Sequence, residues 1–579
     1  MRVPAEISAE PGRGTEATST AQLFERNDAL VIEAFRRGEF DYLEGVGEVP
    51  EANFFRAIAG KKILEKLAAT YPSPCKKHDV PLWVYIASDI SMRFHGEHHF
   101  AAFPYVVRSG GMIDAFGPQM GHKVTHPQTG DVTLVCEGFN DKNDYDRETP
   151  CDHDYLRKMA RKTDAEELQS WFNRDVAGIF KQHHALDAEG IFIGDATYLF
   201  VPNNSKYEGS SRLLFDEHNH PVDREKEKEL TPKERARCRW RRCYKLVSLI
   251  HTNRAGEFFL YAGLEVTSGK DHECPILYRL VEQFVAAHGK GVIKRLILDR
   301  GFLDGPAIGR CKKEWGIDVL IPAKSNMDVY ADVVGLATAG EVSFETWVRP
   351  VAEAKPVPLH RPERVRKREQ ARQRTLAKLK AEAKPDPESI DLSKIRIRSE
   401  VAVIRKVETF STCPVPLNVT VNREVYADGH HEHWVLLDTA PVAQAGQSRQ
   451  DYMLRTHIEE RHRQLKCFSD LEAFTSRAFS LVVHQVVFVL LTYSLMQWYF
   501  LRIGRKELNA RTRTRTLELL RPTTTMIVIY YQNYVAYLSP LEHQELVLTL
   551  GEEARKKILA KTRRLRRHLA EQLQHPRSP

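Results

Sequence analysis

Cysteine is scarce and scattered in this chain. The 579 residues contain nine cysteines, an odd number without regular spacing, which excludes the disulfide framework of small secreted domains. The first 20 residues are rich in Glu, Gly, Ser, Thr and Pro, lack the apolar core of a signal peptide, and are expected to be disordered. These absences predict a protein of a reducing cytoplasm.

Long apolar runs are also rare. The run 478–501 is about long enough to cross a membrane, but it carries His484, Gln485, Thr492, Ser494 and Gln497. It also lacks the flanking pattern of a membrane span. We therefore expect a buried core helix here and no membrane partner.

Positive charge is concentrated in patches. The net charge is +8. Residues 233–245 hold seven cations and one acid, 361–384 hold ten cations and three acids, and 555–567 hold eight cations and no acid. One such patch would be an ordinary solvated surface, but three together favour a nucleic-acid partner.

The stretch 451–466 has neither Gly nor Pro and is rich in good helix formers. At roughly 100° per residue, one face of this helix gathers a phenol, an acid and cations: Tyr452, Arg455, Glu459, Arg463 and Lys466. A different face is apolar: Leu454, Ile458 and Leu465. His462 is near the polar face, where we expect a phosphate contact or packing, and Glu460 is expected to face solvent.

Two aspartates follow apolar strands. We expect a strand in 190–202 that ends at Asp195 and another in 293–298 followed by Asp299. Further strands are expected at 244–253, 257–267 and 318–325, and helices at 275–289 and 306–316. This order resembles the ribonuclease-H-like layout, an α/β fold with a mixed sheet and flanking helices.

The chain is expected to have six parts. They are a disordered tail (1–20), an N-terminal DNA-binding domain (21–185), the catalytic core (186–326 and 433–505), a β-rich insertion (327–432) and a basic helical C-terminal region (506–579) that serves dimerisation or DNA contact. Only position in the chain supports a DNA-binding role for 21–185, because no helix-turn-helix spacing is evident.

Three acids stand out by context: Asp195, Asp299 and Glu459. In a ribonuclease-H-like sheet the strands that carry the two aspartates are neighbours, and the helix could add the glutamate. Three carboxylates at one point repel each other unless a cation neutralises them, and Mg²⁺ prefers such oxygen ligands. Two ions of this kind assist in-line displacement at a phosphodiester.

The spacing Tyr452-x2-Arg455-x3-Glu459-x6-Lys466 resembles the Tyr-Arg-Glu-Lys signature of bacterial insertion-sequence DDE transposases. The resemblance covers about 186–505. It implies that Asp195, Asp299 and Glu459 bind Mg²⁺, with Mn²⁺ as a substitute. It also implies DNA contacts by Tyr452, Arg455, Lys466 and Trp434, with Arg300 and Arg463 as further candidates. Thr456 stands where some members have a second Trp, so the resemblance leaves open whether a hairpin intermediate forms.

The activity implied by this resemblance is cut-and-paste transposition. The enzyme would bind terminal inverted repeats, cleave them and join the 3′-hydroxyl ends to target DNA, as a dimer or larger multimer in the bacterial cytoplasm. Two alternatives stay open: an inactive or domesticated DNA-binding relative, and a ribonuclease-H-like nuclease or resolvase without strand transfer.

A zinc site is a further possibility in the N-terminal region. Cys75 and His78, Cys151 and His153, and Cys136 offer ligand types that zinc uses. The patch 95–100 is rich in histidine but lacks the i, i+4 His pair of a helical zinc site. We expect polar loop residues here rather than a metal centre.

Overall fold

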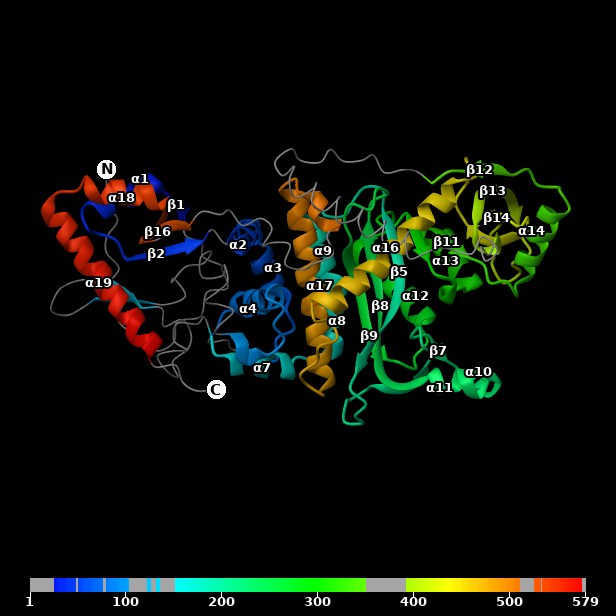
Figure 1. Ribbon diagram of the computed structural model, residues 1–579, viewed down its shortest axis with the longest axis horizontal. Helices are drawn as coiled ribbons and strands as arrows, with labels where there is room; N and C mark the ends of the chain where they lie inside the picture. Colours follow the sequence, from blue (N-terminus) through cyan, green and yellow to red (C-terminus); the bar gives the residue numbers. More distant parts are fainter. Residues whose placement is uncertain are drawn as a thin grey trace, which may run out of the picture. The chain divides into compact units, whose positions relative to one another are not determined.

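The computed structural model shows a mixed α/β protein (Figure 1). The residues that the structure describes are 25–47, 50–76, 80–103, 122–125, 132–135, 151–349, 392–510, 525–532 and 534–574. Two compact units divide the chain: the first combines 1–294 with 457–579, and the second is 295–456. Large sheet content with many helices confirms the α/β prediction at this level. The predicted domain boundaries remain predictions.

In the first unit the central strand is β8 (Arg239–Thr252), which pairs antiparallel with β5 (Ile191–Val201), β6 (Ser211–Phe215) and β9 (Leu260–Ser268). β7 (Pro221–Val222) closes a hairpin with β6. The short helices α10 (Arg224–Glu229) and α11 (Pro232–Arg237) follow it. Helix α12 (Glu273–His288) packs on β8 and ends at Gly289, as expected.

The apolar run forms helix α17 (Phe479–Arg502), which is long and apolar enough to cross a membrane but is mostly buried inside the first unit. Its polar residues explain why it suits a protein core. Gln497 and Ser494 accept hydrogen bonds from the backbone N–H groups of Phe259 and Tyr261 on the free edge of β9. The expected core helix is therefore observed, and its polar side chains satisfy a strand edge that would otherwise be exposed.

Six other helices of the first unit lie near α17 or pack on the helices that contact it. They are α2 (Pro50–Gly60), α3 (Ile63–Thr70), α4 (Leu82–Phe94), α7 (His153–Lys162), α8 (Ala165–Trp171) and α9 (Ala177–Gln182). Gln169 of α8 and Asn173, which follows α8, continue the capping of β9, because they accept from the N–H groups of Val266 and Leu264, respectively. Four side chains thus close this strand edge. A separate pair, β3 (His122–Thr125) and β4 (Val132–Val135), forms a small hairpin.

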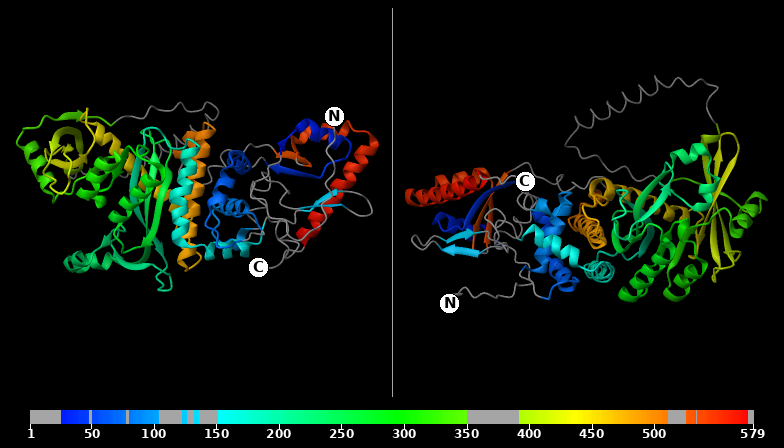
Figure 2. Two further views of the ribbon diagram at one scale, coloured as in Figure 1. Left: turned by 180° about the vertical axis from the view of Figure 1, so that it is seen from behind. Right: turned by 90° about the horizontal axis from the view of Figure 1, so that it is seen from below.

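The two ends of the chain share a four-stranded sheet. Its order is β1 (Glu25–Arg26), β17 (Tyr534–Leu538), β16 (Thr525–Tyr531) and β2 (Tyr42–Gly47). Its core also includes residues from α1 (Asp28–Arg36), α18 (Pro540–Leu548) and α19 (Glu552–Gln574). Blue and orange-red ribbons lie side by side in both views (Figures 1 and 2). The C-terminal region was expected to be helical. Helices α18 and α19 agree with this expectation, whereas the β-branched and aromatic run 525–538 contains the strands β16 and β17.

The second unit contains six neighbouring strands of a mixed sheet. Their order is β12 (Glu345–Trp347), β13 (Arg396–Val407), β14 (Leu417–Tyr426), β15 (His431–Asp438), β11 (Asp318–Pro322) and β10 (Arg295–Leu298). β10 and β11 are parallel, and the other pairs are antiparallel. Helices α13 (Gly305–Trp315) and α14 (Asp328–Thr338) complete the unit. The strands expected as an insertion thus continue the sheet of β11, since β14 pairs with β15 and β15 with β11. The basic run 361–384 lies outside the described residues.

Candidate active site

Helix α16 (Gln447–Phe468) carries most of the predicted site residues. It begins earlier than expected, at Gln447, in a stretch of good helix formers without Pro. Leu454, Ile458 and Leu465 are buried, as the apolar face predicts. Glu459 is exposed on the surface of the helix. The described contacts of α16 fall into two groups, because its first ten residues belong to the second unit and the rest to the first.

In the first unit, α16 contacts Asp195. The expectation that Asp195 ends its strand is wrong, because β5 continues through Thr, Tyr, Leu, Phe and Val to Val201. Asp195 is therefore a buried residue in the middle of β5, opposite Ser248 of β8. Its Oδ2 lies 3.2 Å from Nδ1 of His462, which is also buried. The imidazole thus contacts a carboxylate, and neither predicted role for His462 included this partner.

In the second unit, α16 contacts Asp299. This residue directly follows β10, as expected, and its side chain caps the short 3₁₀ helix Arg300–Phe302 by accepting from the N–H of Arg300. Its Oδ2 lies 3.4 Å from the guanidinium of Arg455. This contact joins Asp299 to α16 within the second unit. Within the first unit, His462 follows Glu459 by three residues, so Asp195 contacts α16 about one helical turn from Glu459.

The two adjacent glutamates of α16 differ in their surroundings. Glu460 accepts two hydrogen bonds from Arg463, at 2.7 and 2.8 Å, and one from Gln464. The Arg463 hydrogen bond is the main cause that lowers the pKa of Glu460 to about 2. Arg463, a predicted DNA contact, therefore forms a surface ion pair with Glu460, which precedes it by three residues on α16.

Lys466, another predicted DNA contact, is tied to β5. Its Nζ donates to the carbonyl oxygen of Tyr198 at 2.5 Å and lies 3.0 Å from Glu472. Burial raises the pKa of the Tyr198 phenol. In this conformation the ammonium group holds the end of α16 to the strand that carries Asp195.

Trp434 and Tyr452 lie together in the second unit, with ring centroids 6.2 Å apart. The guanidinium of Arg449 lies over Trp434 and, at 4.0 Å, over Trp347. Arg449 also pairs with Glu424 at 2.7 Å. Sequence reasoning missed Arg449 and Trp347, because residues so far apart in the chain meet only through the pairing of β12, β13, β14 and β15.

A buried ion pair lies beside this cluster. The guanidinium of Arg295 donates to both oxygens of Asp438, at 2.5 and 2.7 Å, and approaches Asp451 at 3.4 Å. Burial alone would lower the pKa of Arg295, but the hydrogen bond and charge of Asp438 outweigh it and raise the pKa. This contact joins the start of β10, the end of β15 and the start of α16, so it supports the segments on which Asp299 and Arg455 lie.

Residues 207–495 match the family described as the transposase DDE domain. The chain contains a transposase DDE domain. No curated protein matches the chain. The matched part of the DDE domain includes Asp299 and all of α16, and it starts after Asp195. The assignment of Asp195 to the candidate active site therefore depends on its contact with His462 and not on the family match.

The N-terminal zinc candidates do not form a cysteine–histidine cluster among the described residues. Burial raises the pKa of the Cys151 thiol, which disfavours the thiolate that zinc needs. Asp152, His153 and Asp154 are close enough to hold an ion, but Asp152 already caps α7 by accepting from the N–H of Asp154. His78 and Cys136 lie outside the described residues.

Proposed function

We propose that this DDE-domain protein is a cut-and-paste DNA transposase. It binds the terminal inverted repeats of its element, cleaves them by metal-assisted phosphodiester hydrolysis and joins the 3′-hydroxyl ends to target DNA. We further propose that it works on DNA as a dimer or larger multimer in the bacterial cytoplasm. The observation that carries the proposal is that, within the first unit, the buried carboxylate of Asp195 contacts His462, which follows Glu459 by three residues on α16.

The donor set fits a divalent cation. Asp195, Asp299 and Glu459 offer carboxylate oxygens, the ligands that Mg²⁺ and Mn²⁺ prefer, and all three are assigned here as the metal-binding residues. When bound, the metal supplies activation of the attacking hydroxyl and stabilisation of the leaving oxygen.

The remaining residues position these carboxylates and the DNA. His462 contacts Oδ2 of Asp195 and so orients this carboxylate. Arg455 compensates the charge of Asp299 and, with Tyr452 and Lys466, is assigned to the phosphates beside the cleaved bond. We assign Trp434, Arg300 and Arg463 to DNA contacts nearby.

Adjacent glutamates provide a matched test. Full-length wild type, Glu459→Gln and Glu460→Gln are incubated with terminal-repeat duplex DNA and Mg²⁺, and cleavage and joining are followed on gels. Glu459→Gln should lose detectable cleavage because it removes a metal ligand. Glu460→Gln should keep near-wild-type cleavage, because it removes only a partly exposed ion pair. Equal activity of the two variants would refute the assignment of Glu459.

The same reactions separate the alternatives. Cleavage without joined product indicates a ribonuclease-H-like nuclease or resolvase. Binding of terminal-repeat DNA without cleavage by the wild type, in Mg²⁺ and in Mn²⁺, indicates an inactive relative. Asp195→Asn, which lies outside the family match, should behave like Glu459→Gln if it belongs to the same centre.

A further inference from the structure

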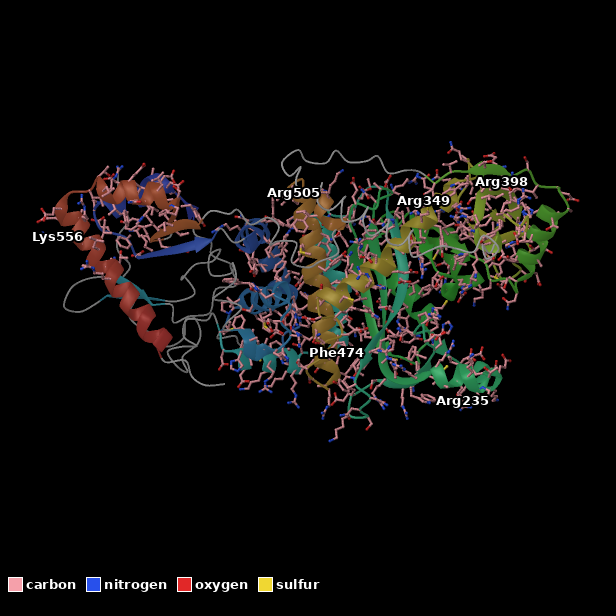
Figure 3. The ribbon with its side chains drawn as sticks, viewed as in Figure 1. Arg235, Arg349, Arg398, Phe474, Arg505 and Lys556 are labelled. Carbon is pink, nitrogen blue, oxygen red and sulfur yellow. The ribbon has the colours of Figure 1, made fainter. Side chains whose placement is uncertain are left out.

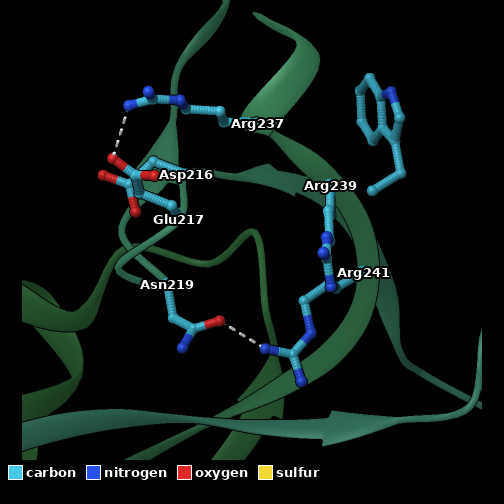
Figure 4. Close-up of a pocket in the computed structure, with 7 residues that line it drawn as sticks. Asp216, Glu217, Asn219, Arg237, Arg239 and Arg241 are labelled. Carbon is cyan, nitrogen blue, oxygen red and sulfur yellow. Dashed lines mark hydrogen bonds and ion pairs between the residues drawn. The ribbon is translucent and has the colours of Figure 1, made fainter. Parts of the chain in front are cut away.

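Strands β6 and β8 form an antiparallel ribbon in the first unit. A pocket of about 460 Å³ opens at the end of the ribbon where β6 ends and β8 begins. The pocket is lined by residues of the β6–β7 turn and of the entry into β8: Asp216, Glu217, Asn219, Arg237, Arg239, Trp240 and Arg241. Figure 4 shows two contacts at its upper and lower edges, one between Arg237 and Glu217 and one between Asn219 and Arg241. Nothing in the proposed chemistry uses this pocket.

The strand register places cations on both faces of the ribbon. Successive side chains of a strand alternate between faces, so Arg239 and Arg241 share one face, and Trp240 and Arg242 share the other. Arg212 of β6 is paired with Arg242, and its guanidinium lies over the Trp240 ring at 5.2 Å. The start of β8 is exposed, and 48% of Trp240 is accessible to solvent. A large indole in this position is available to a partner.

The acids of the pocket are already engaged. Glu217 pairs with Arg237 at 3.2 Å. Asp216 accepts from the backbone N–H groups of His218 and His220 and contacts the His220 ring. These carboxylates therefore stabilise the hairpin and do not neutralise the arginines of β8.

Four guanidinium groups of the ribbon have no carboxylate partner among the described residues: Arg212, Arg239, Arg241 and Arg242. Arg241 donates to the neutral amide of Asn219 and stacks on Phe200. Arg242 donates to the carbonyl and hydroxyl of Ser210. The result is a ribbon with concentrated, uncompensated positive charge beside an exposed indole.

We propose that the β6–β8 ribbon is a DNA-binding surface additional to α16, in which its arginines contact phosphates and Trp240 stacks on an unpaired base. Guanidinium groups are well suited to phosphate oxygens, and aromatic rings beside a basic groove accept bases of any sequence. The choice of DNA as the polyanion that binds the ribbon rests on the proposed function. Figure 3 shows Arg235 on α11, the helix that precedes β8 in the chain.

The test measures binding by the full-length protein without divalent metal, so cleavage does not enter. Fluorescence anisotropy is followed between about 50 and 200 mM salt with two labelled DNAs, a blunt duplex and the same duplex with a single-stranded overhang. The variants are Arg239→Ala, Arg239→Lys and Trp240→Ala. The control is Lys290→Ala, which removes an exposed cation elsewhere in the same unit.

Arg239→Ala should weaken binding to both DNAs and reduce the salt slope by about one. Arg239→Lys should restore most of the slope, and Lys290→Ala should match the wild type. Trp240→Ala should weaken binding to the overhang DNA by roughly 5- to 150-fold and reduce its advantage over the blunt duplex.

A salt slope for Arg239→Ala equal to that of the wild type would overturn the ribbon as a phosphate-binding surface. An unchanged ratio between overhang and blunt DNA for Trp240→Ala would overturn the stacking role. Circular dichroism checks that each exposed substitution leaves the fold intact. These results are independent of the Glu459→Gln cleavage test, so failure of the inference and failure of the proposed function are distinguishable.

Discussion

The buried pair between Arg295 and Asp438 gives the sharpest prediction about stability. Both side chains are almost fully buried, and the guanidinium contacts both carboxylate oxygens. Arg295→Met removes the cation and leaves a buried carboxylate whose remaining donors are the N–H of Ala440 and the hydroxyl of Ser448. Breaking a buried pair in this way costs about 3–5 kcal/mol of unfolding free energy.

The matched control is an exposed pair. Arg279 contacts both oxygens of Glu265 at 2.6 and 2.7 Å, but its side chain is 49% exposed. Arg279→Met should therefore cost less than about 1 kcal/mol. Denaturant unfolding is followed by tryptophan fluorescence, to which Trp347 and Trp434 of the second unit contribute.

A double variant separates two contributions to the loss of unfolding free energy, the lost attraction between the partners and the cost of a buried, unpaired charge. Asp438→Asn removes the negative charge and keeps one oxygen as the acceptor for the N–H of Ala440, while its amide N–H₂ can donate to the hydroxyl oxygen of Ser448. Arg295→Met combined with Asp438→Asn should therefore lose less stability than Arg295→Met alone. The reasoning is refuted if Arg295→Met and Arg279→Met cost the same, or if the losses of the two single variants simply add.

Two further predictions concern backbone packing and pH. A Cβ at Gly309 would overlap the ring of Pro414, whereas a Cβ at Gly335 would meet open space. In the same unfolding assay Gly309→Ala should lose about 1–3 kcal/mol and Gly335→Ala should gain about 0.5–1 kcal/mol; equal effects would contradict this geometry. His251 is buried, both ring nitrogens contact backbone groups, and burial lowers its pKa to about 4. The contribution of neutral His251 to the unfolding free energy should therefore be complete above pH 6.5 and should fall by up to about 3 kcal/mol towards pH 4. His251→Gln should reduce this dependence of the unfolding free energy on pH. The part of the dependence that comes from His484, whose pKa is also lowered to about 4, should remain.

Local patterns in the sequence predicted the elements around the site well. The helix with the acid and cations, the apolar core helix, and the strand before Asp299 all occur where residue type and periodicity place them. Each depends on contacts within a few residues along the chain, so one sequence is sufficient to identify them. The place of Asp195 within β5 was missed, because an acid after four apolar or small residues resembles a strand end.

Long-range partners could not be predicted in the same way. The sheet shared by the chain ends joins residues almost 500 positions apart, Tyr42 with Tyr530 for example. The edge of β9 is capped by amide and hydroxyl side chains from helices before and after it in the sequence. Such contacts follow from the fold rather than from a local pattern, because any polar side chain at the right distance satisfies a backbone N–H.

Charge on α16 and charge on the β6–β8 ribbon differ in a way that composition does not reveal. The three cations of α16 that are predicted to contact DNA pair with carboxylates within the protein: Arg455 with Asp299, Arg463 with Glu460 and Lys466 with Glu472. In the ribbon, Arg212, Arg241 and Arg242 contact neutral groups or aromatic rings. Neither these three nor Arg239 has a carboxylate partner among the described residues. Electrostatic attraction of DNA depends on uncompensated charge. In the proposed function, the ribbon therefore contributes more to the capture of DNA than α16, while α16 acts where a bound metal ion takes over the charge of the carboxylates.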